Sequence, residues 1–290
     1  MAGDRGLAGV YRDAMRRHPF GYALYEPVPF SRLRPGTLGY LDDYQRWHPI
    51  LDLADAKAVQ DAGYSPMGHL QRSEPDVRRY GPLTSSGTSA VDVELEAAAS
   101  AAAFSLPVDV SGVFRYSTSG DFGAVLMCDD DVISEGFDFR NVFLIWLKRN
   151  AKALFAKYPD AKKHGICAVT WTYSSTNIHI TAWEGAGNSV TVGFKAGAAG
   201  VVDVGPQMTW LRGRSGSAWS EWTGEKRVIF FTGVNIRTGL FGPKEQQEKG
   251  WRGREYFMVE SDGDDGDYRV NVELFGDDWH RIKDSEYLNN

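Results

Sequence analysis

A long alternation of apolar and polar residues, between positions 189 and 204, most constrains what this chain can fold into. The stretch reads SVTVGFKAGAAGVVDV, and every second residue from Val190 is apolar or glycine, while the interleaved residues are mostly small or polar. Successive side chains of a strand point to opposite faces, so the pattern predicts one apolar and one polar face. About 15 such residues span roughly 50 Å, whereas a typical strand has about 5–6 residues. The apolar set includes Val190, Val192, Phe194 and Val202.

A second alternation, over residues 88–117, predicts a first long hairpin. In TSAVDVELEAAASAAAF the odd positions are apolar, and after a turn at 105–107 the even positions are apolar. We therefore expect a hairpin with one apolar and one polar face. The segment 94–104 fits a helix equally well, because alanine is the best helix former and is depleted in strands. The apolar positions include Val91, Val93, Leu95, Val108, Val110 and Phe114.

Residues 169–182 are expected to pair with the 189–204 strand as a second long hairpin, joined by a Gly/Asn-rich turn at 184–188. The apolar phase slips between Ser174 and Asn177, which predicts a β-bulge. Trp171, Ile178 and Ile180 carry the apolar face of this strand. Two further strands are expected over 207–237, around a turn at 213–217.

Two segments, 4–17 and 139–158, have the periodicity of amphipathic helices. Each carries bases on its polar side, which are either a solvated charged face or a contact for anionic lipid. The bases of the first segment are Arg5, Arg12, Arg16 and Arg17, and those of the second are Lys148, Arg149 and Lys152.

Charge is unevenly distributed along the 290 residues. From residue 240 onward there are 7 Lys+Arg and 13 Asp+Glu, so these 51 residues hold the whole net charge of −6. Residues 240–254 are polar and contain Pro and Gly, which is typical of an exposed linker, and a strand pair is expected around the following SDGDDGD.

No sequence motif points to an enzyme or to a cofactor. The chain has no G-x-S-x-G, H-E-x-x-H, P-loop or G-x-G-x-x-G pattern, and its six histidines are scattered. Residues 1–239 carry no net charge and the residues after them are acidic, so the chain lacks the basic domain that nucleic-acid binding needs. Residues 1–18 lack the apolar stretch of a signal peptide, so the two cysteines are expected to be free thiols in the cytosol. The longest aliphatic and aromatic run, 142–147, is far shorter than the ~20 residues of a spanning helix.

The two alternating hairpins leave two interpretations open. They fit long antiparallel hairpins in the sheet of a soluble protein. They also fit the strands of a membrane barrel, which need about 9–11 residues with one apolar face. Four such strands cannot close a wide barrel, and open edges are very costly in lipid, so several chains would have to supply strands to one ring.

The order of these elements resembles the pore-forming N-terminal domain of gasdermins. A basic N-terminal helix and a long hairpin come first, followed by the basic helix in RNVFLIWLKRNAKALFAKYPDAKKHG and the strand ICAVTWTY. A second hairpin and the closing pattern TGEKRVIFFTGVNIR come last. The short acidic tail departs from the large inhibitory domain of the animal proteins, and is closer to the short-tailed fungal gasdermin-like proteins of heterokaryon incompatibility and regulated cell death. The resemblance implies an α+β fold, a twisted antiparallel sheet with two long hairpins and surrounding helices.

The resemblance implies that residues 1–240 form the pore-forming domain and that 241–290 form a tail which masks it or completes the fold. The protein would be cytoplasmic when inactive. When active it would bind acidic phospholipids at the plasma membrane or another acidic-lipid membrane, form a homo-oligomeric ring and insert both hairpins. A protease acting in 240–254, or an allelic partner protein, would trigger it. The residues considered for cleavage are Leu240, Phe241, Lys244, Lys249, Arg252 and Arg254.

Two other classes of protein share such hairpins. A secreted actinoporin- or aerolysin-like toxin would have them, but a signal peptide and disulfides would be expected with it. A soluble β-rich binding module would show a ligand pocket and no membrane activity.

Overall fold

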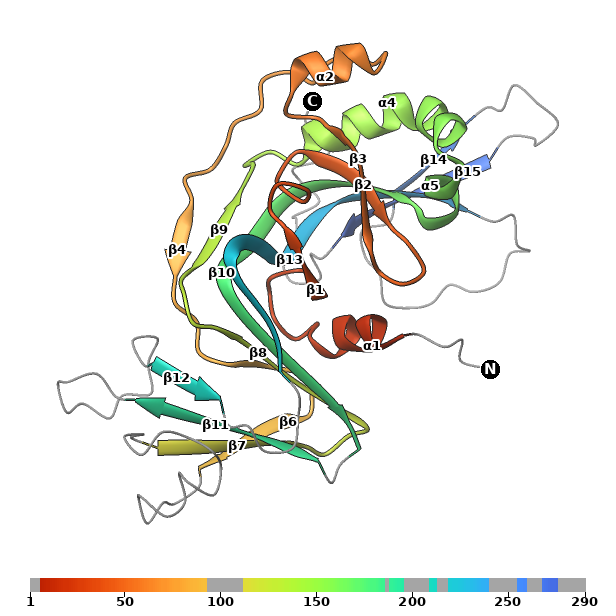
Figure 1. Cartoon of the computed structure of the whole chain (residues 1–290). Coiled ribbons are helices and arrows are strands. Elements are labelled where there is room, and N and C mark those ends of the chain that lie inside the picture. The colour runs from red at the N-terminus through yellow and green to blue at the C-terminus, as the bar shows by residue number, and fades with distance from the viewer. Residues whose placement is uncertain are drawn as a thin grey trace.

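The computed structural model describes residues 6–92, 112–185, 188–195, 209–212, 219–239, 255–259 and 268–275. The chain has an α+β fold in which a large, twisted antiparallel sheet carries helices at one end and a smaller sheet at the other (Figure 1). The predicted fold class is confirmed.

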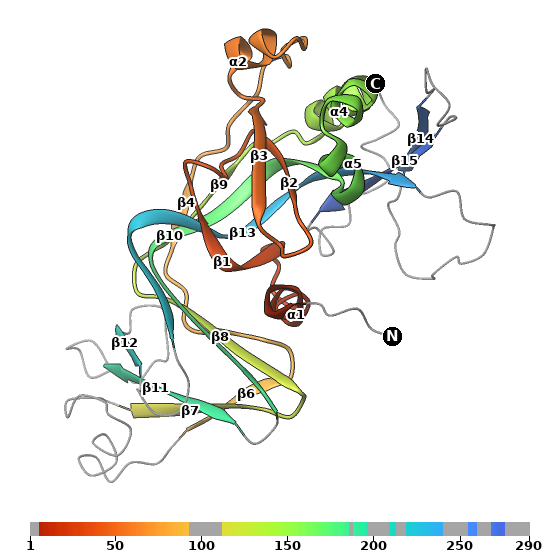
Figure 2. The same ribbon diagram turned by 45° about the vertical axis from the view of Figure 1, so that its right-hand side comes forward.

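Two long strands, β10 (Ile166–Glu184) and β13 (Ser220–Gly239), form the centre of the large sheet. Their register shifts three times, between Val169 and Trp171, between Tyr173 and Ser174, and between Ser175 and Asn177. The last shift lies at the phase slip in the sequence, which confirms an irregularity there. From the pair Ser175–Arg227 to the pair Asn177–Thr223 the chain advances two residues on β10 and four on β13, so the extra residues lie on β13 and not on β10. Bulges bend a strand and increase its twist, and both strands curve strongly in Figure 2.

Shorter strands complete the large sheet. The order is β14-β15-β13-β10-β2-β3; β1 also pairs with β13, β8 and β9 pair with β10, β5 pairs with β8, and β4 pairs with β9. Their bounds are β1 Tyr22–Pro29, β2 Thr37–Leu41, β3 Trp47–Asp52, β4 Asp76–Arg78, β5 Leu83–Thr84, β8 Phe122–Cys128, β9 Val132–Gly136, β14 Glu255–Val259 and β15 Tyr268–Phe275.

The smaller sheet has four strands in the order β12-β11-β7-β6. These are β6 (Thr88–Asp92), β7 (Gly112–Thr118), β11 (Ser189–Lys195) and β12 (Thr209–Arg212). β6 pairs with β7 as the first hairpin predicts, and the residues between them, 93–111, lie outside the description. β11 pairs with β7 and with β12.

The predicted pairing of the second hairpin is wrong, because the structure pairs β11 with β12 and not with β10. Both edges of β10 are already occupied where it approaches β11. Ile178 lies opposite Cys128 of β8 on one side and opposite Trp222 of β13 on the other. The alternating stretch from Ser189 therefore continues into a different sheet.

Four helices lie within the described ranges: α1 (Leu7–Ala14), α2 (Ala56–Asp61), α4 (Asn141–Lys157) and α5 (Pro159–His164). α4 packs on the large sheet through its predicted apolar face, since Phe143, Leu147, Ala151 and Leu154 are fully buried. α1 is shorter than predicted and buries Tyr11 against β8, β10 and β13.

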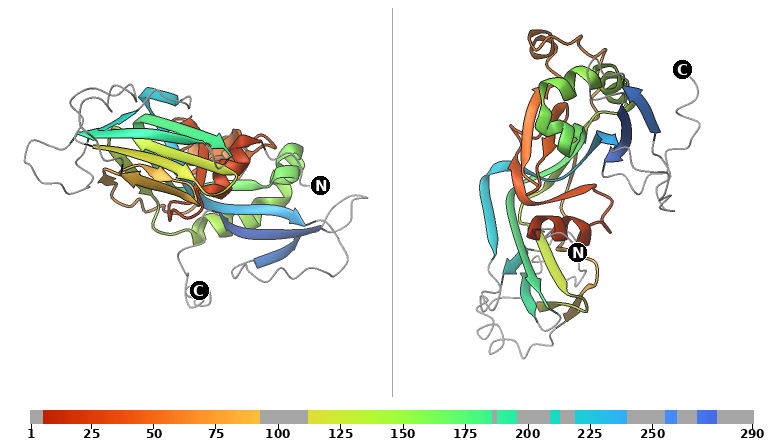
Figure 3. Two further views of the ribbon diagram at one scale, coloured as in Figure 1. Left: turned by 90° about the horizontal axis from the view of Figure 1, so that it is seen from below. Right: turned by 90° about the vertical axis from the view of Figure 1, so that its right-hand side faces the viewer.

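The residues after 240 add two strands to the large sheet, as the sequence predicts. β15 pairs with β13 over the seven residue pairs from Gly233 to Gly239, and β14 pairs with β15 (Figure 3). Val270 is fully buried in the core beneath α4, together with Ile166 and Ile236. This part of the tail thus completes the sheet in this state.

Candidate functional site

Two neighbouring chain segments pass from the large sheet into the small sheet at one corner. β7 leads into β8 through residues 119–121, and β10 leads into β11 through residues 185–188. β8 and β10 are partners in the large sheet, and β7 and β11 are partners in the small sheet. The corner therefore bends a two-stranded ribbon rather than a single strand (Figure 1).

The antiparallel register of this ribbon is the same on both sides of the corner. Phe122 lies opposite Glu184 before the corner and Ser117 lies opposite Ser189 after it. Within the corner, the N–H of Gly185 donates to the carbonyl of Asp121 at 2.8 Å, which is the next pair of the same register. Four residues on each strand, 118–121 and 185–188, separate these two pairs, so the strands have no net insertion at the corner, where the N–H of Asn188 also donates to the carbonyl of Gly185 in a turn.

Most even-numbered positions carry apolar residues or glycine along both strands of the ribbon, and the exceptions, Thr118, Glu184 and Asn188, lie at the corner. On the small sheet, Tyr116, Val190 and Val192 are buried against β8 and β10, where they meet Val125 and Trp183. On the large sheet, the even positions belong to a different cluster, which α1 covers. This second cluster includes Ala124, Leu126, Cys128, Ile178 and Ile180 with Tyr11 and Met15 of α1.

A glycine allows the two strands to pack closely beside the corner. Trp183 lies across Gly123, its partner on β8. A Cβ built on Gly123 would lie 2.3 Å from Cε2 of Trp183, which no real contact allows. The indole therefore occupies the space that any other residue at position 123 would need.

The arginines of the first predicted helix lie beside this corner. Arg12 pairs with Asp13 at 2.8 Å, and the side chain of Arg16 is half-exposed and 3.8 Å from the same carboxylate. Arg17 donates to the hydroxyl of Thr84 on β5, and the ring of His18 lies 2.8 Å from the Thr84 carbonyl. The structure thus brings Arg17 and His18 beside β5, which directly precedes the first hairpin. Arg5 lies outside the described residues.

The bases of α4 lie at the other end of the molecule. Lys148, Arg149 and Lys152 project from α4, whereas the small sheet extends from the opposite end of the large sheet (Figure 3, right). The two groups of basic residues predicted from the sequence are therefore not brought together.

A turn that the sequence analysis did not single out lies next to α1. It joins β2 to β3 through residues 42–46, and Arg12 donates to Gln45 in it at 3.4 Å. Tyr44 at its tip is 75% exposed, and the Arg46 guanidinium lies 5.0 Å from the Tyr44 ring centre. The clustered turn-forming and charged residues of LDDYQRW were the available signal.

Asp42 holds the shape of this turn. Its carboxylate accepts the backbone N–H groups of Tyr44 and Arg46, each at 2.9 Å, and pairs with the Arg46 side chain. Partial burial raises the pKa of Asp42, but hydrogen bonds from the Arg46 backbone, His48 and the Arg46 side chain outweigh it and lower the pKa to about 2.

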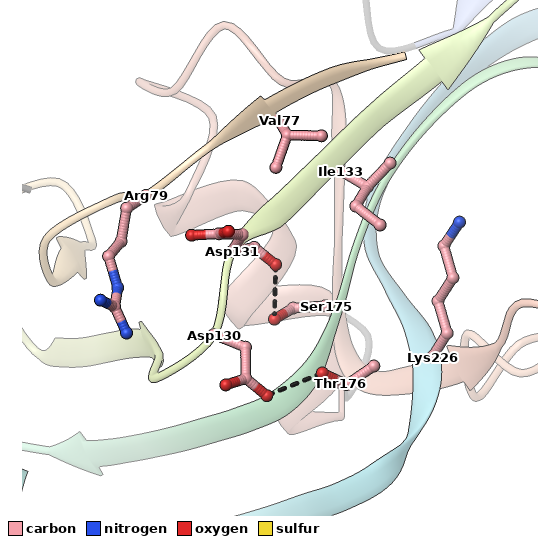
Figure 4. Close-up of a pocket in the computed structure, with 8 residues that line it drawn as sticks. All are labelled: Val77, Arg79, Asp130, Asp131, Ile133, Ser175, Thr176 and Lys226. Carbon is pink, nitrogen blue, oxygen red and sulfur yellow. Dashed lines mark hydrogen bonds between the residues drawn. The ribbon is translucent and has the colours of Figure 1, made fainter.

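A hollow of about 370 Å³ lies between β4, β9, β10 and β13 (Figure 4). Asp130, Lys226 and Arg79 in its lining already have partners in the chain. Thr176 donates to Asp130, Lys226 pairs with Glu135, and Arg79 donates to the carbonyl of Asp129. We assign no ligand to it.

The remaining predicted residues fall into two sets. Val91, Phe114 and Phe194 lie in the small sheet, and Trp171 lies in β10, where its indole N–H donates to Ser134 at 2.7 Å. Others lie outside the described residues, namely Val93, Leu95, Val108, Val110, Val202 and all six residues considered for cleavage.

Among the helices in the described ranges, none has the length and apolar character needed to span a bilayer. In comparisons with known proteins, the chain matches no family model and no curated sequence.

Proposed function

We propose that this chain is a membrane pore-forming protein of the gasdermin type. It binds acidic phospholipids, oligomerises and inserts two β-hairpins per subunit, which permeabilises the membrane and causes cell death. The observation that carries the proposal is the register that the β7–β8 and β10–β11 ribbon shares on the two sides of its corner. Such a ribbon can straighten without breaking and re-forming its pairing.

Straightening would produce an amphipathic ribbon. Even positions share one face of a straight strand, so Phe114, Tyr116, Val190 and Val192 would continue the face that bears Leu126 and Ile180. Seventeen residues on each strand exceed the about 9–11 that a tilted strand needs to cross the hydrocarbon core. The apolar face that is now buried at the corner would then face lipid.

The small sheet has the strand directions that assembly into a ring requires. Its three pairings are antiparallel, so its outer strands, β6 and β12, run in opposite directions. β12 of one copy placed beside β6 of the next would continue the antiparallel pattern from copy to copy. Such a head-to-tail contact generates a closed ring when the rotation between copies closes, and it removes the edges that lipid does not tolerate.

The initial lipid contact is assigned to α1 and the neighbouring β2–β3 turn. Arg16, Arg46, the exposed Tyr44 and the half-exposed Leu7 belong to these two adjoining elements. A base near an anionic surface contributes about 1 kcal/mol, so binding needs several together. Arg5, Arg12 and Arg17 are further members of this surface, and Lys148, Arg149 and Lys152 are secondary candidates.

Control is assigned to residues 241–290, with residues 1–240 as the pore-forming domain. A protease acting in 240–254 would free the tail to leave β13 when the chain meets the membrane, or an allelic partner protein would displace it there. The inactive chain would be cytoplasmic, and the active chain would act at the plasma membrane or another acidic-lipid membrane. No catalytic step and no cofactor form part of the proposal.

Dye release from liposomes tests this function. We would compare vesicles with and without acidic phospholipid, using the full chain with an engineered protease site in 240–254, before and after cleavage. Leakage only with acidic lipid, and mainly after cleavage, is the expected result. If the uncut chain released as much dye as the cut chain, the tail would have no masking role, and pore formation would still stand. A folded chain that releases no dye, cut or uncut, would contradict pore formation by the protein alone.

A pair of charge variants separates lipid binding from folding. R16Q/R46Q removes two bases of the α1 and β2–β3 surface, and K148Q/K152Q removes two from α4. At about 1 kcal/mol per base, the first pair should weaken binding to acidic vesicles roughly 30-fold. The second pair should have a smaller effect on lipid binding. Both variants should stay folded, with R16Q/R46Q slightly less stable because it loses the exposed Arg46–Asp42 ion pair. Equal losses of vesicle affinity in the two variants would contradict the assignment of the lipid contact to α1.

A further inference from the structure

α1 covers the face of the ribbon that is opposite to the small sheet. The apolar even positions of β8 and β10 pack against Tyr11 and Met15 of α1, whereas the odd positions Val125 and Trp183 meet the small sheet. α1 and the small sheet thus lie on opposite faces of the same two strands (Figure 2). The face beneath α1 bears Leu126, and it is the one that the even positions of the small sheet would continue in a straight ribbon.

α1 is also bonded to the corner at which the ribbon bends. Residues 85–87 lead from β5 of the large sheet into β6 of the small sheet, so they are a third crossing of this corner. The N–H of Ser86 donates to the carbonyl of Ala14, the last residue of α1, at 2.7 Å. Arg17, just after the helix, donates to the hydroxyl of Thr84. Because α1 packs on the large sheet, a straightening that moves residues 85–87 must break the Ser86 bond or displace α1.

Two features weaken the hold on α1. Tyr11 is fully buried, and its hydroxyl has no hydrogen-bond partner among the described residues. Burying such a group costs free energy that is regained when the hydroxyl meets water. The helix has only eight residues, and its N-cap is Gly6, which has no side chain to cap it, so its position depends on packing and not on intrinsic helix stability. α1 is therefore easier to displace than its buried apolar side chains alone imply.

We propose that α1 is a cover that acidic lipid displaces: in this state it buries the apolar face of β8 and β10 and holds the corner bent. Arginine often binds phosphate through two parallel hydrogen bonds, whereas the Thr84 hydroxyl is a single neutral acceptor, so a lipid headgroup at Arg17 competes with Thr84. Displacement of α1 uncovers Leu126 and Ile180 and frees Ser86 at the corner. Lipid binding and straightening of the ribbon are thereby coupled. This inference rests on the proposed function.

A cysteine pair at Ala14 and Ser86 can report the position of α1 and can also lock it. With standard bond lengths, their hydrogen bond puts the two Cα atoms at most about 6.6 Å apart, which is within the range of a disulfide. Ser86 is exposed and Ala14 is partly exposed, so A14C/S86C leaves the core intact. S117C/S189C is the matched control, since Ser117 and Ser189 are opposed in the small sheet and stay opposed when the ribbon straightens.

Both pairs would be cross-linked in the full-length chain cleaved after folding, in solution, on neutral vesicles and on vesicles that contain acidic phospholipid. Oxidation and a short bismaleimide would be used, because the bismaleimide tolerates more side-chain directions than a disulfide. Burial raises the pKa of both native thiols, Cys128 and Cys167, which leaves them slow to react. Labelling of each single cysteine with N-ethylmaleimide corrects for changes in thiol access.

On acidic vesicles A14C/S86C should cross-link at least about tenfold more slowly than in solution, because it can close only in molecules that keep α1 in place. On neutral vesicles it should keep its solution rate, and S117C/S189C should keep its rate throughout. A corrected A14C/S86C rate that acidic vesicles leave unchanged would overturn the cover.

The locked forms give a second readout. Oxidised A14C/S86C fixes α1 to the corner and should abolish dye release from acidic vesicles, which reductant restores. Oxidised S117C/S189C should leave release unchanged, and its failure to release dye would contradict the kept pairing of β7 and β11 on which the proposed function rests. Release that persists with the A14C/S86C lock overturns the cover while the pore stands. Slower A14C/S86C cross-linking on acidic vesicles, with no dye release from any form, keeps the cover and contradicts the pore.

Discussion

The backbone N–H of Gly185 donates a 2.8 Å hydrogen bond to the carbonyl of Asp121 at the point where the ribbon turns from one sheet into the other. Gly185 has a φ of 86°, a conformation that costs other residues about 1–2 kcal/mol. The nearest atom to a Cβ built there is 3.9 Å away, so this cost is one of backbone conformation alone. The corner therefore bends at a residue whose backbone conformation glycine adopts without strain and other residues do not.

Gly185→Ala should lower the free energy of unfolding by about 1 kcal/mol, because alanine disfavours the positive φ. Denaturant unfolding measures the change. Gly68→Ala is the matched control, since it has open space and no positive φ, and should leave stability the same or slightly raised. Equal changes in stability for the two variants would show that the bend does not require glycine at position 185.

Gly123→Ala should destabilise the protein by about 1–3 kcal/mol, because the added methyl group must displace Trp183. The near-ultraviolet circular dichroism of the indole should change with it. In a Trp183→Val background the same substitution should cost much less, because the indole is gone. If Gly123→Ala destabilised the Trp183→Val protein just as much, the loss would come from the β8 backbone and not from contact with the indole.

Met15→Ala should destabilise the protein by about 2–5 kcal/mol, because Met15 is fully buried against the even positions of β8 and β10. Leu7→Ala on the same helix removes a side chain that is 42% exposed, so its cost should be small. Thermal unfolding of the two variants gives the comparison. Similar melting temperatures would contradict the packing of α1 on this sheet.

Asp42 should make stability depend on acid pH. Its pKa is lowered to about 2 in the folded chain by the hydrogen bonds of the β2–β3 turn, compared with about 3.9 when unfolded. A lowered folded pKa stabilises the fold above the unfolded value, and that contribution is lost as pH falls from about 4 to about 2. Unfolding free energies across this range should fall less steeply in Asp42→Asn. Parallel curves for the two proteins would contradict the assignment.

Cleavage in 240–254 should leave the tail bound to the body. β15 retains seven residue pairs with β13, and Val270 remains in the core. The cut fragments should co-elute in gel filtration under native conditions. Val270→Asp should separate them, because an unpaired carboxylate is costly to bury, whereas Lys57→Ala on exposed α2 should not. Spontaneous separation of the wild-type fragments would show that cutting alone releases the tail.

Local pattern was enough to predict much of the fold. The periodicity of 139–158 and the alternation of 112–118 and 189–195 are properties of consecutive residues, so they identify a helix and strands before any tertiary contact is known. The phase slip near Ser175 likewise marked a shift of register, but the extra residues lie on the partner strand β13, which the pattern of β10 alone does not show.

Partner choice and register depended on the whole chain. Residues 189–195 carry an apolar face that suits any matching strand, and only the occupation of both edges of β10 by β8 and β13 directs them to β7 and β12. Ser85 and Ser86, just before β6, are hydrogen-bonded to β8 and to the end of α1, which are distant in sequence. The sequence by itself thus determined which segments form strands and helices. The tertiary structure decided how they pair, because hydrogen-bonding edges are shared among all strands and each edge accepts only one neighbour.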